Sequence, residues 1–493
     1  MKHLPIVWSI AGSDSGGGAG IQADIKAIHG LGCHPCTAIT AVTAQNTVGV
    51  QKVAALEPAD VRAQLESLAA DLPPAAIKIG MVPNRAIAEE IRNAIGEFDC
   101  PVVLDPVLVS SSGARLCEDP GGEPAWMLAP HADVVCPNLQ EAQALLSREI
   151  RGSGAIEQAA HDLVERGCRA VIIKGGHGDG ALCQDYLHDG SRGLWISNTR
   201  LDTRNTHGTG CTQSSALAAA MAQGIARLDD AAVVARMFVN AAIRESSNVG
   251  EGPGPVRASG WPEASADLPW VTETAAAANK RPVFPPPGYA PIGLYPCVET
   301  ADWVARLAEL GVTTIQLRNK SLEGDALRAQ VKAAVETARR CNVRLFVNDY
   351  WKLAIEHGAY GVHLGQEDIG NADIERIAEA GLRLGVSTHC HAEVARAHAL
   401  RPSYIACGPI WETKVKAMAF PPQGVESLAL WRRTLAGYPL VAIGGIDAPR
   451  AYEVSRAGAD GVALIRAITQ ADDYRAATRE LVKQVERGRL DAG

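Results

Sequence analysis

The chain has 493 residues, 47% hydrophobic and 21% charged, a composition typical of globular proteins and long enough for two or three domains. Its 47 Lys and Arg residues against 55 Asp and Glu residues give a net charge of -8, which argues against broad nucleic-acid binding. Twelve cysteines are too few for a disulfide scaffold, so we expect free thiols in a reducing cytoplasm. Neither a signal peptide nor an apolar run of about 20 residues is expected, and so no membrane span.

Up to residue 258, short apolar runs alternate with alanine-rich stretches, a pattern that predicts an α/β domain with an open, doubly wound sheet. The first helix, expected over residues 21–31, places Ile21, Ile25, Ile28 and Leu31 on one stripe. The predicted strands are Ile6–Ile10, Thr37–Thr43, Ile77–Gly80, Val102–Asp105, Val134–Pro137 and Ala170–Lys174.

Residues 259–290 predict a linker, because three consecutive prolines, Pro285 to Pro287, favour an extended chain. This linker divides a domain at residues 1–258 from a domain at residues 291–493. Eight short apolar runs in the second domain predict a (β/α)8 barrel, with an open sheet of similar period as the alternative. They are Gly293–Cys297, Thr314–Leu317, Arg344–Asn348, Gly361–Leu364, Arg383–Ser387, Tyr404–Gly408, Leu440–Gly444 and Gly461–Ile465. In both folds ligands bind beyond the carboxyl ends of the strands.

Two segments of the first domain combine strand ends with polar groups. The glycine-rich run 11–20 joins the first strand to its helix and lets backbone amides approach a ligand, although a structural turn explains it equally well. Asp24 falls on the inward stripe of that helix, where an unpaired carboxylate would be costly to bury. We therefore expect it to accept a hydrogen bond from a ligand, with a helix-dipole role as the alternative. Gln45, at the end of the second strand, has an amide suited to a heterocycle edge, although a polar strand-end turn explains this segment equally well.

The run Asn205-Thr-His-Gly-Thr-Gly-Cys-Thr212 precedes a helix of small residues. Gly208, Gly210 and Cys211 would present backbone N–H groups at the helix start, an anion hole for a transferring phosphoryl group. The helix field should lower the pKa of the Cys211 thiol, so this residue is expected to act as a base or as part of the hole. A structural glycine-rich helix entry is the alternative. Groups that suit transfer from magnesium-bound ATP follow other strands: Asp105, Asn138, Glu141 and Lys174.

These motifs, together with Lys78-Ile-Gly-Met81 and Val171-Ile-Ile-Lys-Gly-Gly-His177, resemble hydroxymethylpyrimidine/phosphomethylpyrimidine kinase, a member of the ribokinase-like superfamily. The resemblance covers nearly all of residues 1–258. It implies that Asp24 and Gln45 hold the pyrimidine and that Met81 lines its pocket. It also implies that Asp105, Asn138, Glu141 and Lys174 serve ATP and Mg2+.

Polar residues also follow the barrel strands. Gln316, Arg318 and Lys320 alternate at the end of the second strand and can bind a pyrophosphate. Asp349 and Asp368, after the third and fourth strands, form a plausible pair around a magnesium ion. The remaining candidates are Asn348 and Ser387 at strand ends, Lys416 in a loop, and the backbone at Gly445 and Ile465 for a phosphate.

The barrel motifs Gln316-Leu-Arg-Asn-Lys320, Val347-Asn-Asp349, Val362-His-Leu-Gly-Gln-Glu-Asp368 and Ile443-Gly-Gly-Ile446 resemble thiamine-phosphate synthase over about residues 290–488. That family joins a pyrimidine pyrophosphate to a thiazole phosphate and releases pyrophosphate. The resemblance aligns the segment from Thr413 to Lys416 with substrate-binding residues, but Val415 stands where a threonine is usual. Thiazole tautomerases share the barrel and lack the full pyrophosphate-binding set.

Two other motifs are expected to be inert: Cys33 and Cys36 as packed thiols, and His389-Cys-His391 as a segment without a second pair of zinc ligands. The combined resemblance implies a bifunctional thiamine-biosynthesis enzyme that acts on small molecules and forms a homo-oligomer. From the charge balance and the lack of an apolar span we expect binding to neither nucleic acid nor membrane. The alternatives are a kinase for pyridoxal or a related vitamin, and a sensor that binds these ligands without turnover.

Overall fold

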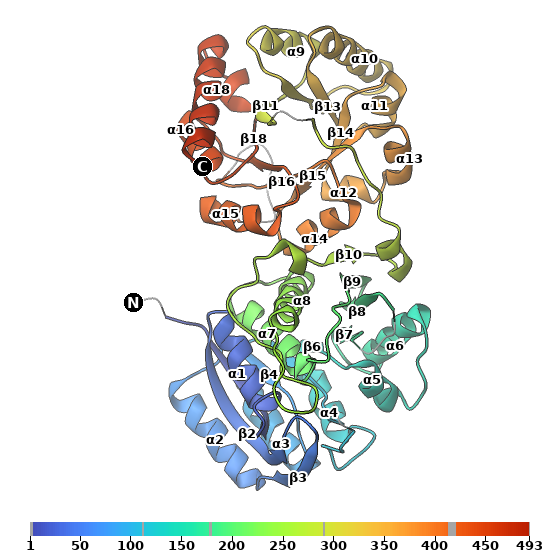
Figure 1. The fold of residues 1–493 in the computed structure, drawn as a ribbon, viewed down its shortest axis with the longest axis vertical. Helices are drawn as coiled ribbons and strands as arrows, with labels where there is room; N and C mark the ends of the chain where they lie inside the picture. The colour runs from blue at the N-terminus through green and yellow to red at the C-terminus, as the bar shows by residue number, and fades with distance from the viewer. Residues whose placement is uncertain (1–2, 111–112, 177–179, 289–290, 413–420, 493) are drawn as a thin grey trace. The chain divides into compact units, whose positions relative to one another are not determined.

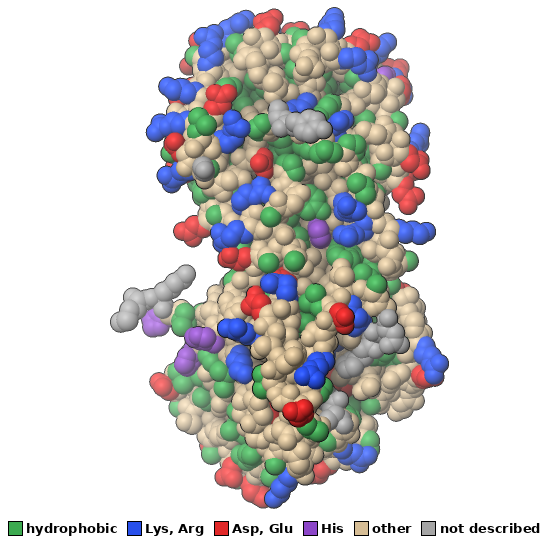
Figure 2. All heavy atoms as spheres, viewed as in Figure 1, with side chains coloured by type: hydrophobic (Ala, Val, Ile, Leu, Met, Phe, Trp, Pro, Cys, Tyr) green, Lys and Arg blue, Asp and Glu red, His purple; other side chains and the backbone are tan. Residues whose placement is uncertain are grey.

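The computed structural model describes residues 3–110, 113–176, 180–288, 291–412 and 421–492. The chain divides into two compact units, Met1–Pro262 with Ala266–Asn279, and Glu263–Ser265 with Lys280–Gly493. Basic and acidic side chains are interspersed over the face of each unit drawn in Figure 2. An anionic ligand would therefore depend on local groups and not on a broad positive field.

The first unit is built on a ten-stranded sheet in the order β10-β9-β8-β7-β6-β5-β4-β1-β2-β3 (Figure 1). The six predicted strands are confirmed and pair in parallel. They are β1 (Ile6–Asp14), β2 (His34–Gln45), β4 (Ala76–Ile79), β5 (Val102–Leu104), β6 (Val134–Val135) and β7 (Val171–Ile173). Four antiparallel strands were not predicted: β3 (Val50–Ala55), β8 (Leu182–His188), β9 (Gly193–Thr199) and β10 (Trp270–Thr272).

Helices cover both faces of this sheet, which confirms the doubly wound architecture. On one face the apolar sides of five helices pack with the strands in one core: α2 (Pro58–Asp71), α3 (Arg85–Ile95), α4 (Glu123–Leu128), α5 (Leu139–Leu146) and α6 (Ser153–Glu165). The other layer consists of α1 (Gly20–Gly30), α7 (Thr209–Ala222) and α8 (Leu228–Arg244). Small side chains allow α7 to be buried from Ser214 to Ala220.

The expected apolar stripe of α1 is wrong at one position. Ile21, Ile28 and Leu31 are buried, but Ile25 is 37% exposed. Asp24 takes the inward place instead and is fully buried. The helix therefore turns a carboxylate, not an isoleucine, toward the interior.

The second unit is a closed barrel of eight parallel strands, in chain order, with β11 pairing β18. This confirms the predicted (β/α)8 barrel. Its strands are β11 (Gly293–Val298), β12 (Thr314–Leu317), β13 (Arg344–Asn348), β14 (Gly361–Leu364), β15 (Arg383–Thr388), β16 (Tyr404–Cys407), β17 (Leu440–Ile443) and β18 (Gly461–Leu464). The helices described between and after them are α9 (Ala301–Ala308), α10 (Gly324–Arg340), α11 (Trp351–His357), α12 (Gln366–Ile369), α13 (Ile374–Glu379), α14 (His391–Leu400), α15 (Gly424–Thr434), α16 (Ala448–Arg456), α17 (Arg466–Thr469) and α18 (Tyr474–Asp491).

Aromatic rings fill the barrel interior. Tyr295, Phe346 and Tyr404 meet edge to face, with ring centroids 5.2 to 5.9 Å apart. Glycines make room for two of these rings: a Cβ at Gly361 would lie 2.5 Å from the Phe346 ring, and a Cβ at Gly385 would lie 2.1 Å from the Tyr404 ring. The interior is thus a packed core with polar atoms on its tyrosines.

Part of the segment expected to be a linker over residues 259–290 forms short elements: the turns Ser265–Asp267 and Ala275–Asn279 and the strand β10. β10 pairs with β9 of the first sheet, because its Trp270 and Val271 have apolar side chains to bury. The segment Pro285–Pro287, here called the proline strap, belongs to the barrel unit. Its carbonyl groups accept hydrogen bonds from side chains at the starts of four consecutive strands, β13 to β16: Arg344, Tyr360, Arg383 and Ser403.

Among the described residues, no helix is both long enough and apolar enough to cross a membrane.

Candidate active sites

A cavity of about 340 Å³ opens at the carboxyl ends of the parallel strands of the first unit. This volume lies within the usual range for small-ligand pockets. The predicted site residues that line it come from five strand ends and one helix start: Gln45, Met81, Asp105, Asn138, Glu141, Lys174, Gly208, Gly210 and Cys211. The strand-end rule therefore brings nine predicted residues of this unit to one cavity.

The N-terminus of α7 supplies an anion-binding group in this cavity. Gly208 precedes the helix with a φ of 81°, and a Cβ there would lie 1.8 Å from the Gly18 carbonyl oxygen, so only glycine fits. Among the described residues, no hydrogen-bond acceptor is found for the N–H groups of Gly210 and Cys211. These two donors at a helix start can bind a phosphoryl oxygen.

Lys174 adds a positive charge beside this helix start. A Cβ at Gly210 would lie 3.2 Å from Lys174 Nζ, and Lys174 Nζ itself lies 2.6 Å from Asp105 Oδ1. The second oxygen of Asp105 accepts a hydrogen bond from Ser214 at 2.9 Å. Burial raises the pKa of Glu141, with Lys174 opposing the shift and Asp105 adding to it. Two carboxylates and a lysine thus share a small buried volume, a composition that suits a metal-bound phosphate.

Asn138 and Glu141 also have a structural role. Asn138 Oδ1 accepts from the N–H of Glu141 at 2.9 Å, and Glu141 Oε2 accepts from the N–H of Asn138 at 2.7 Å, which forms a capping box at the start of α5. The box fixes both side chains at the edge of the cavity.

Two expectations about this cavity are corrected. Burial raises the pKa of the Cys211 thiol to about 11, against the opposing effect of Lys78, which is the opposite direction to the expected lowering. The thiol is protonated at neutral pH and is poorly suited to act as a base. Asp24 is not among the residues that line the cavity; it binds Lys78 at 2.8 Å and the hydroxyl groups of Ser9 and Ser215 at 2.6 and 2.7 Å. These partners explain its inward position without a ligand.

In the second unit, the predicted residues meet at the carboxyl ends of the barrel strands. Lys320, after β12, forms an ion pair with Asp349, after β13. Asp349 has a φ of 63°, a conformation that is unfavourable for a residue with a side chain. Burial raises the pKa of Asp368, at the start of α12, and the hydrogen-bonded neighbour Asp349 raises it further. Two carboxylates held this close repel one another, which a divalent cation would relieve.

Other predicted barrel residues lie at neighbouring strand ends. Gln316 and Asn348 are buried in β12 and β13, and Ser387 is half-buried in β15. Gly445, with a φ of 67°, follows β17, and Ile465 follows β18. Thr413, Val415 and Lys416 lie outside the described residues.

Comparison with known proteins matches both units. Residues 14–257 match the family model of phosphomethylpyrimidine kinase, and residues 295–468 match that of thiamine monophosphate synthase. A protein of Oryza sativa subsp. japonica, named probable thiamine biosynthetic bifunctional enzyme, chloroplastic, is 33% identical over 97% of this chain and 88% of its own length. The chain belongs to the family of thiamine biosynthetic bifunctional enzymes.

Relatives of single units agree with membership in this bifunctional family. The thiamine-phosphate synthase of Serratia proteamaculans is 51% identical over 40% of this chain and 92% of its own length. The pyridoxal kinase from Staphylococcus aureus, solved with AMP-PCP and pyridoxal, is 30% identical over 55% of this chain and all of its own, with a TM-score of 0.50. The first unit is therefore the kinase unit and the second the synthase unit.

The sequence analysis missed two polar residues in the cavity of the kinase unit. Asp14 accepts hydrogen bonds from the N–H groups of Gly16, Gly18 and Ala19 at 2.8 to 3.0 Å. His207 Nε2 lies 3.1 Å from Asp14 Oδ2 and 3.4 Å from Gln45 Nε2. Burial alone would raise the pKa of Asp14, but its hydrogen bonds with His207, Ala19 and Gly16 outweigh burial and lower the pKa. Both residues stand in motifs that were singled out for their glycines, which is the signal that could have found them.

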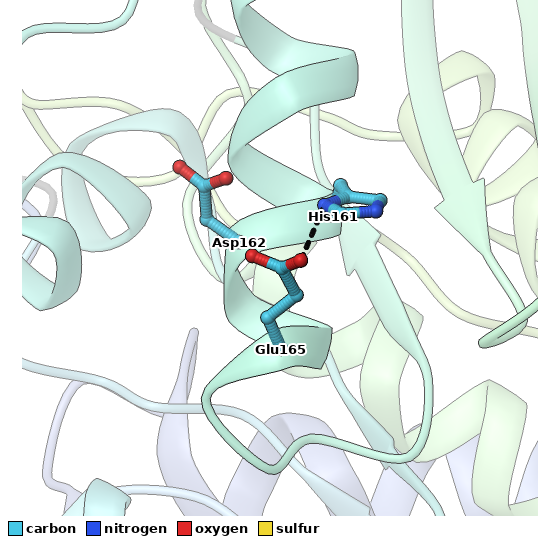
Figure 3. Close-up of side chains that lie close together, drawn as sticks. All are labelled: His161, Asp162 and Glu165. Atoms are coloured by element: carbon cyan, nitrogen blue, oxygen red, sulfur yellow. Dashed lines mark ion pairs between the residues drawn. The ribbon is translucent and has the colours of Figure 1, made fainter.

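Three side chains on the surface of α6 have the residue types of a metal site, but they have protein partners. His161, Asp162 and Glu165 lie close together on the helix surface (Figure 3). His161 and Asp162 each already have a partner: His161 is 3.7 Å from Glu165, and Asp162 binds Arg148 at 2.5 Å and Gln158 at 2.7 Å. The cluster is a solvated helix face.

The side chains of the two motifs expected to be inert are packed against protein. Cys33 and Cys36 are buried, free thiols. His389 Nδ1 lies 2.7 Å from Glu393 Oε2, and the His391 ring packs on Trp431 with centroids 4.6 Å apart. These contacts are those of ordinary packing.

Proposed function

We propose that the kinase unit phosphorylates 4-amino-5-hydroxymethyl-2-methylpyrimidine and then its monophosphate from MgATP. The synthase unit couples the resulting pyrophosphate to a thiazole phosphate, giving thiamine phosphate and pyrophosphate. The observation that carries this proposal is the presence, in one chain, of a cavity with an anion hole beside Lys174 and a barrel mouth with Lys320 beside two carboxylates. The two units also follow one another in the order of the reactions.

In the kinase unit, the N–H groups of Gly210 and Cys211 bind the transferring phosphoryl group, and Gly208 keeps the helix start open. Lys174 stabilises the charge that develops on the phosphate oxygens. Magnesium neutralises the phosphates of the nucleotide when bound, and the oxygen ligands Asp105, Asn138 and Glu141 suit this ion.

The pyrimidine lies against Gln45 and Met81 in this proposal. Met81 Sδ faces the turn at Gly12, where a Cβ would lie only 2.7 Å away, so the wall of the cavity is tightly packed at this point. Gln45 lies next to His207, which places an amide and an imidazole at the same end of the cavity. Asp14 lies within hydrogen-bonding distance of this imidazole. We therefore add Asp14 and His207 to the proposed substrate-binding residues.

In the synthase unit, Arg318 and Lys320 bind the pyrophosphate and stabilise its departure. Asp349 and Asp368 fit a magnesium ion, because they place two carboxylates side by side and Mg2+ prefers oxygen ligands. Magnesium would supply charge for the leaving pyrophosphate. The pyrimidine-methyl cation left behind is attacked by the thiazole nitrogen, and the substrates are held by Gln316, Asn348, Ser387, Thr413, Lys416, Gly445 and Ile465.

The direct test supplies the purified chain with ATP, Mg2+, the pyrimidine alcohol and thiazole phosphate. Thiamine phosphate should form, and omission of ATP should stop its formation unless the pyrimidine pyrophosphate is added. No product from a folded protein would overturn the proposal. Binding of pyrimidine without turnover would instead favour the sensor.

A second candidate substrate is pyridoxal. The kinase unit is 30% identical, with a TM-score of 0.50, to the pyridoxal kinase of Staphylococcus aureus solved with ADP. We propose the pyrimidine alcohol as the preferred substrate, because a synthase for its product follows in the same chain. The ratio of kcat/KM for the two alcohols decides between them.

We propose a reducing compartment, the cytoplasm, for these reactions. Eight of the twelve cysteines are buried, which suits a compartment that keeps thiols reduced. The Oryza relative is named chloroplastic. Fractionation of the source cells would test the location.

A further inference from the structure

Five side chains form a continuous hydrogen-bonded chain inside the barrel of the synthase unit. Gln316 Nε2 lies 3.4 Å from Tyr295 Oη, and Tyr295 Oη lies 2.8 Å from Tyr404 Oη. Tyr404 Oη lies 2.7 Å from His363 Nδ1, and His363 Nε2 lies 2.9 Å from Ser387 Oγ. We call this series the tyrosine–histidine chain. It links two of the predicted substrate-binding residues, Gln316 and Ser387, through three residues that the sequence analysis did not single out.

The barrel interior places these polar side chains among apolar ones. Gln316, Tyr295, Tyr404 and His363 are 0 to 6% exposed, in a core otherwise filled by apolar side chains. A Cβ at Gly385 would lie 2.3 Å from Tyr404 Oη, so β15 has no side chain where the phenol group passes. A phenylalanine would fill the same space without a buried polar atom, and stability alone does not require the hydroxyl groups.

The donor and acceptor in each hydrogen bond of the tyrosine–histidine chain follow from the chemistry of its side chains. The nitrogen of the Gln316 amide can only donate, so Tyr295 Oη accepts from it. If Tyr295 then donates to Tyr404, and Tyr404 donates to His363 Nδ1, both tyrosine hydroxyl protons have an acceptor. In the reverse direction the Tyr295 proton would be buried without an acceptor among the described residues, which is costly.

This direction determines how Ser387 can bind. A buried histidine with no carboxylate within hydrogen-bonding distance of its ring is neutral, so it has one donor and one acceptor nitrogen. With Nδ1 as the acceptor, Nε2–H donates to Ser387 Oγ. The Ser387 hydroxyl proton is then directed away from His363, and Ser387 is half-buried at the carboxyl end of β15.

We propose that the tyrosine–histidine chain makes Ser387 a hydrogen-bond donor to an acceptor atom of the pyrimidine pyrophosphate, with His363 and Tyr404 as positioning residues. The proposal rests on the proposed synthase function. It goes beyond that function by naming the sense of one hydrogen bond and the buried residues that fix it. A substrate acceptor atom, such as a ring nitrogen or a phosphate oxygen, satisfies the Ser387 proton.

The first test is Tyr404→Phe in the full chain, which removes one oxygen atom and interrupts the chain. The KM for the pyrimidine pyrophosphate should rise by about tenfold, the effect of one misdirected hydrogen bond, while the KM for thiazole phosphate stays unchanged. The control is Tyr438→Phe, because Tyr438 Oη makes an equivalent hydrogen bond to His398 Nδ1 at 2.9 Å in the same unit. This control should leave both KM values unchanged.

The second test separates positioning from packing at His363. In His363→Gln the amide nitrogen can stand near the place of Nε2 and still donate to Ser387, whereas His363→Asn is too short to do so. The Gln variant should keep the KM for the pyrimidine pyrophosphate within about threefold, and the Asn variant should raise it by about tenfold. Equal losses in both variants would indicate a purely structural role and overturn the proposal.

The third test observes the tautomer directly. In the 15N-labelled protein, the signals of His363 are those absent from His363→Gln, and they should show the proton on Nε2. A proton on Nδ1 would reverse the chain and overturn the proposal. If the unaltered protein forms no thiamine phosphate from the pyrimidine pyrophosphate and thiazole phosphate, the proposed function fails instead. If it does so and Tyr404→Phe behaves like Tyr438→Phe, only the present inference fails.

Discussion

Lys78 Nζ lies 2.8 Å from Asp24 Oδ2 and 3.0 Å from Asp24 Oδ1, and neither side chain reaches solvent. The pair lies beneath the cavity, with Lys78 forming part of its wall. A buried ion pair of this kind is sensitive to loss of one partner, because the remaining charge stays buried.

Asp24→Asn should therefore lower the free energy of unfolding of the kinase unit by about 3 kcal/mol. Hydrogen exchange measured in peptides from residues 3–110 and 291–412 reports the two units separately. The control Glu90→Gln breaks the surface pair with Arg62, whose side chain is 53% exposed, and should cost less than about 1 kcal/mol. A stable Asp24→Asn protein with a strongly raised KM for the pyrimidine would restore the role in ligand binding that the sequence suggested.

Gly208→Ala should lower kcat of the kinase reaction by about 100-fold, because the added Cβ would collide with the Gly18 carbonyl oxygen and displace the anion hole. Gly224→Ala is a matched control: Gly224 has a similar φ of 90°, and nothing lies within 4 Å of the added Cβ. Steady-state kinetics on both variants separate the steric effect from backbone strain. Equal effects on kcat would mean that strain alone is responsible.

Lys320→Ala should lower the coupling rate by at least about 100-fold and leave the kinase rate unchanged. Lys320 contacts Asp349 at the barrel mouth, so its loss removes a cation from the pyrophosphate and leaves two carboxylates unopposed. The control is Lys332→Ala on the exposed face of α10. Separate assays of phosphorylation and coupling check the result, and loss of both activities in a folded protein would contradict independent sites.

Cys211 should react slowly with iodoacetamide at pH 8, although it lines the cavity. Burial raises its pKa to about 11, so about one thiol in a thousand is ionised at pH 8. The rate should rise about tenfold for each pH unit up to pH 10, with no plateau. Mass spectrometry of the labelled peptides can compare it with Cys341, which is exposed at the end of α10. Faster labelling of Cys211 than of Cys341 at pH 7 would show that the helix field prevails.

The parts of the fold that could be predicted are those with the simplest physical signature. Parallel strands buried on both faces are short apolar runs, and all fourteen predicted strands of this type are present. Two of the four antiparallel strands that were missed do not have that signature. β3 has mostly exposed residues, and β8 contains Gln184 and Asp185 in its centre.

The positions of Asp105, Lys174 and Asp349 at strand ends were predictable, because each directly follows an apolar run. Partners distant in sequence were not predictable: Lys78 is 54 residues from Asp24, and the two meet only through the fold. The pKa of Cys211 could not be judged either, because a helix position indicates the field and says nothing of burial. The side chains of the tyrosine–histidine chain come from five strands. The sequence of one strand does not indicate which side chains of the other four it will contact.

The proline strap has a practical consequence for dividing this chain. Four side chains of the barrel hold carbonyl groups of Pro285, Pro286 and Pro287, so these residues belong to the synthase unit as much as any of its strands. A gene fragment that starts at residue 291 would encode a barrel without the three carbonyl groups to which those side chains donate. A fragment that starts at residue 280 retains the strap, and it is the better choice for anyone who wishes to express the synthase alone.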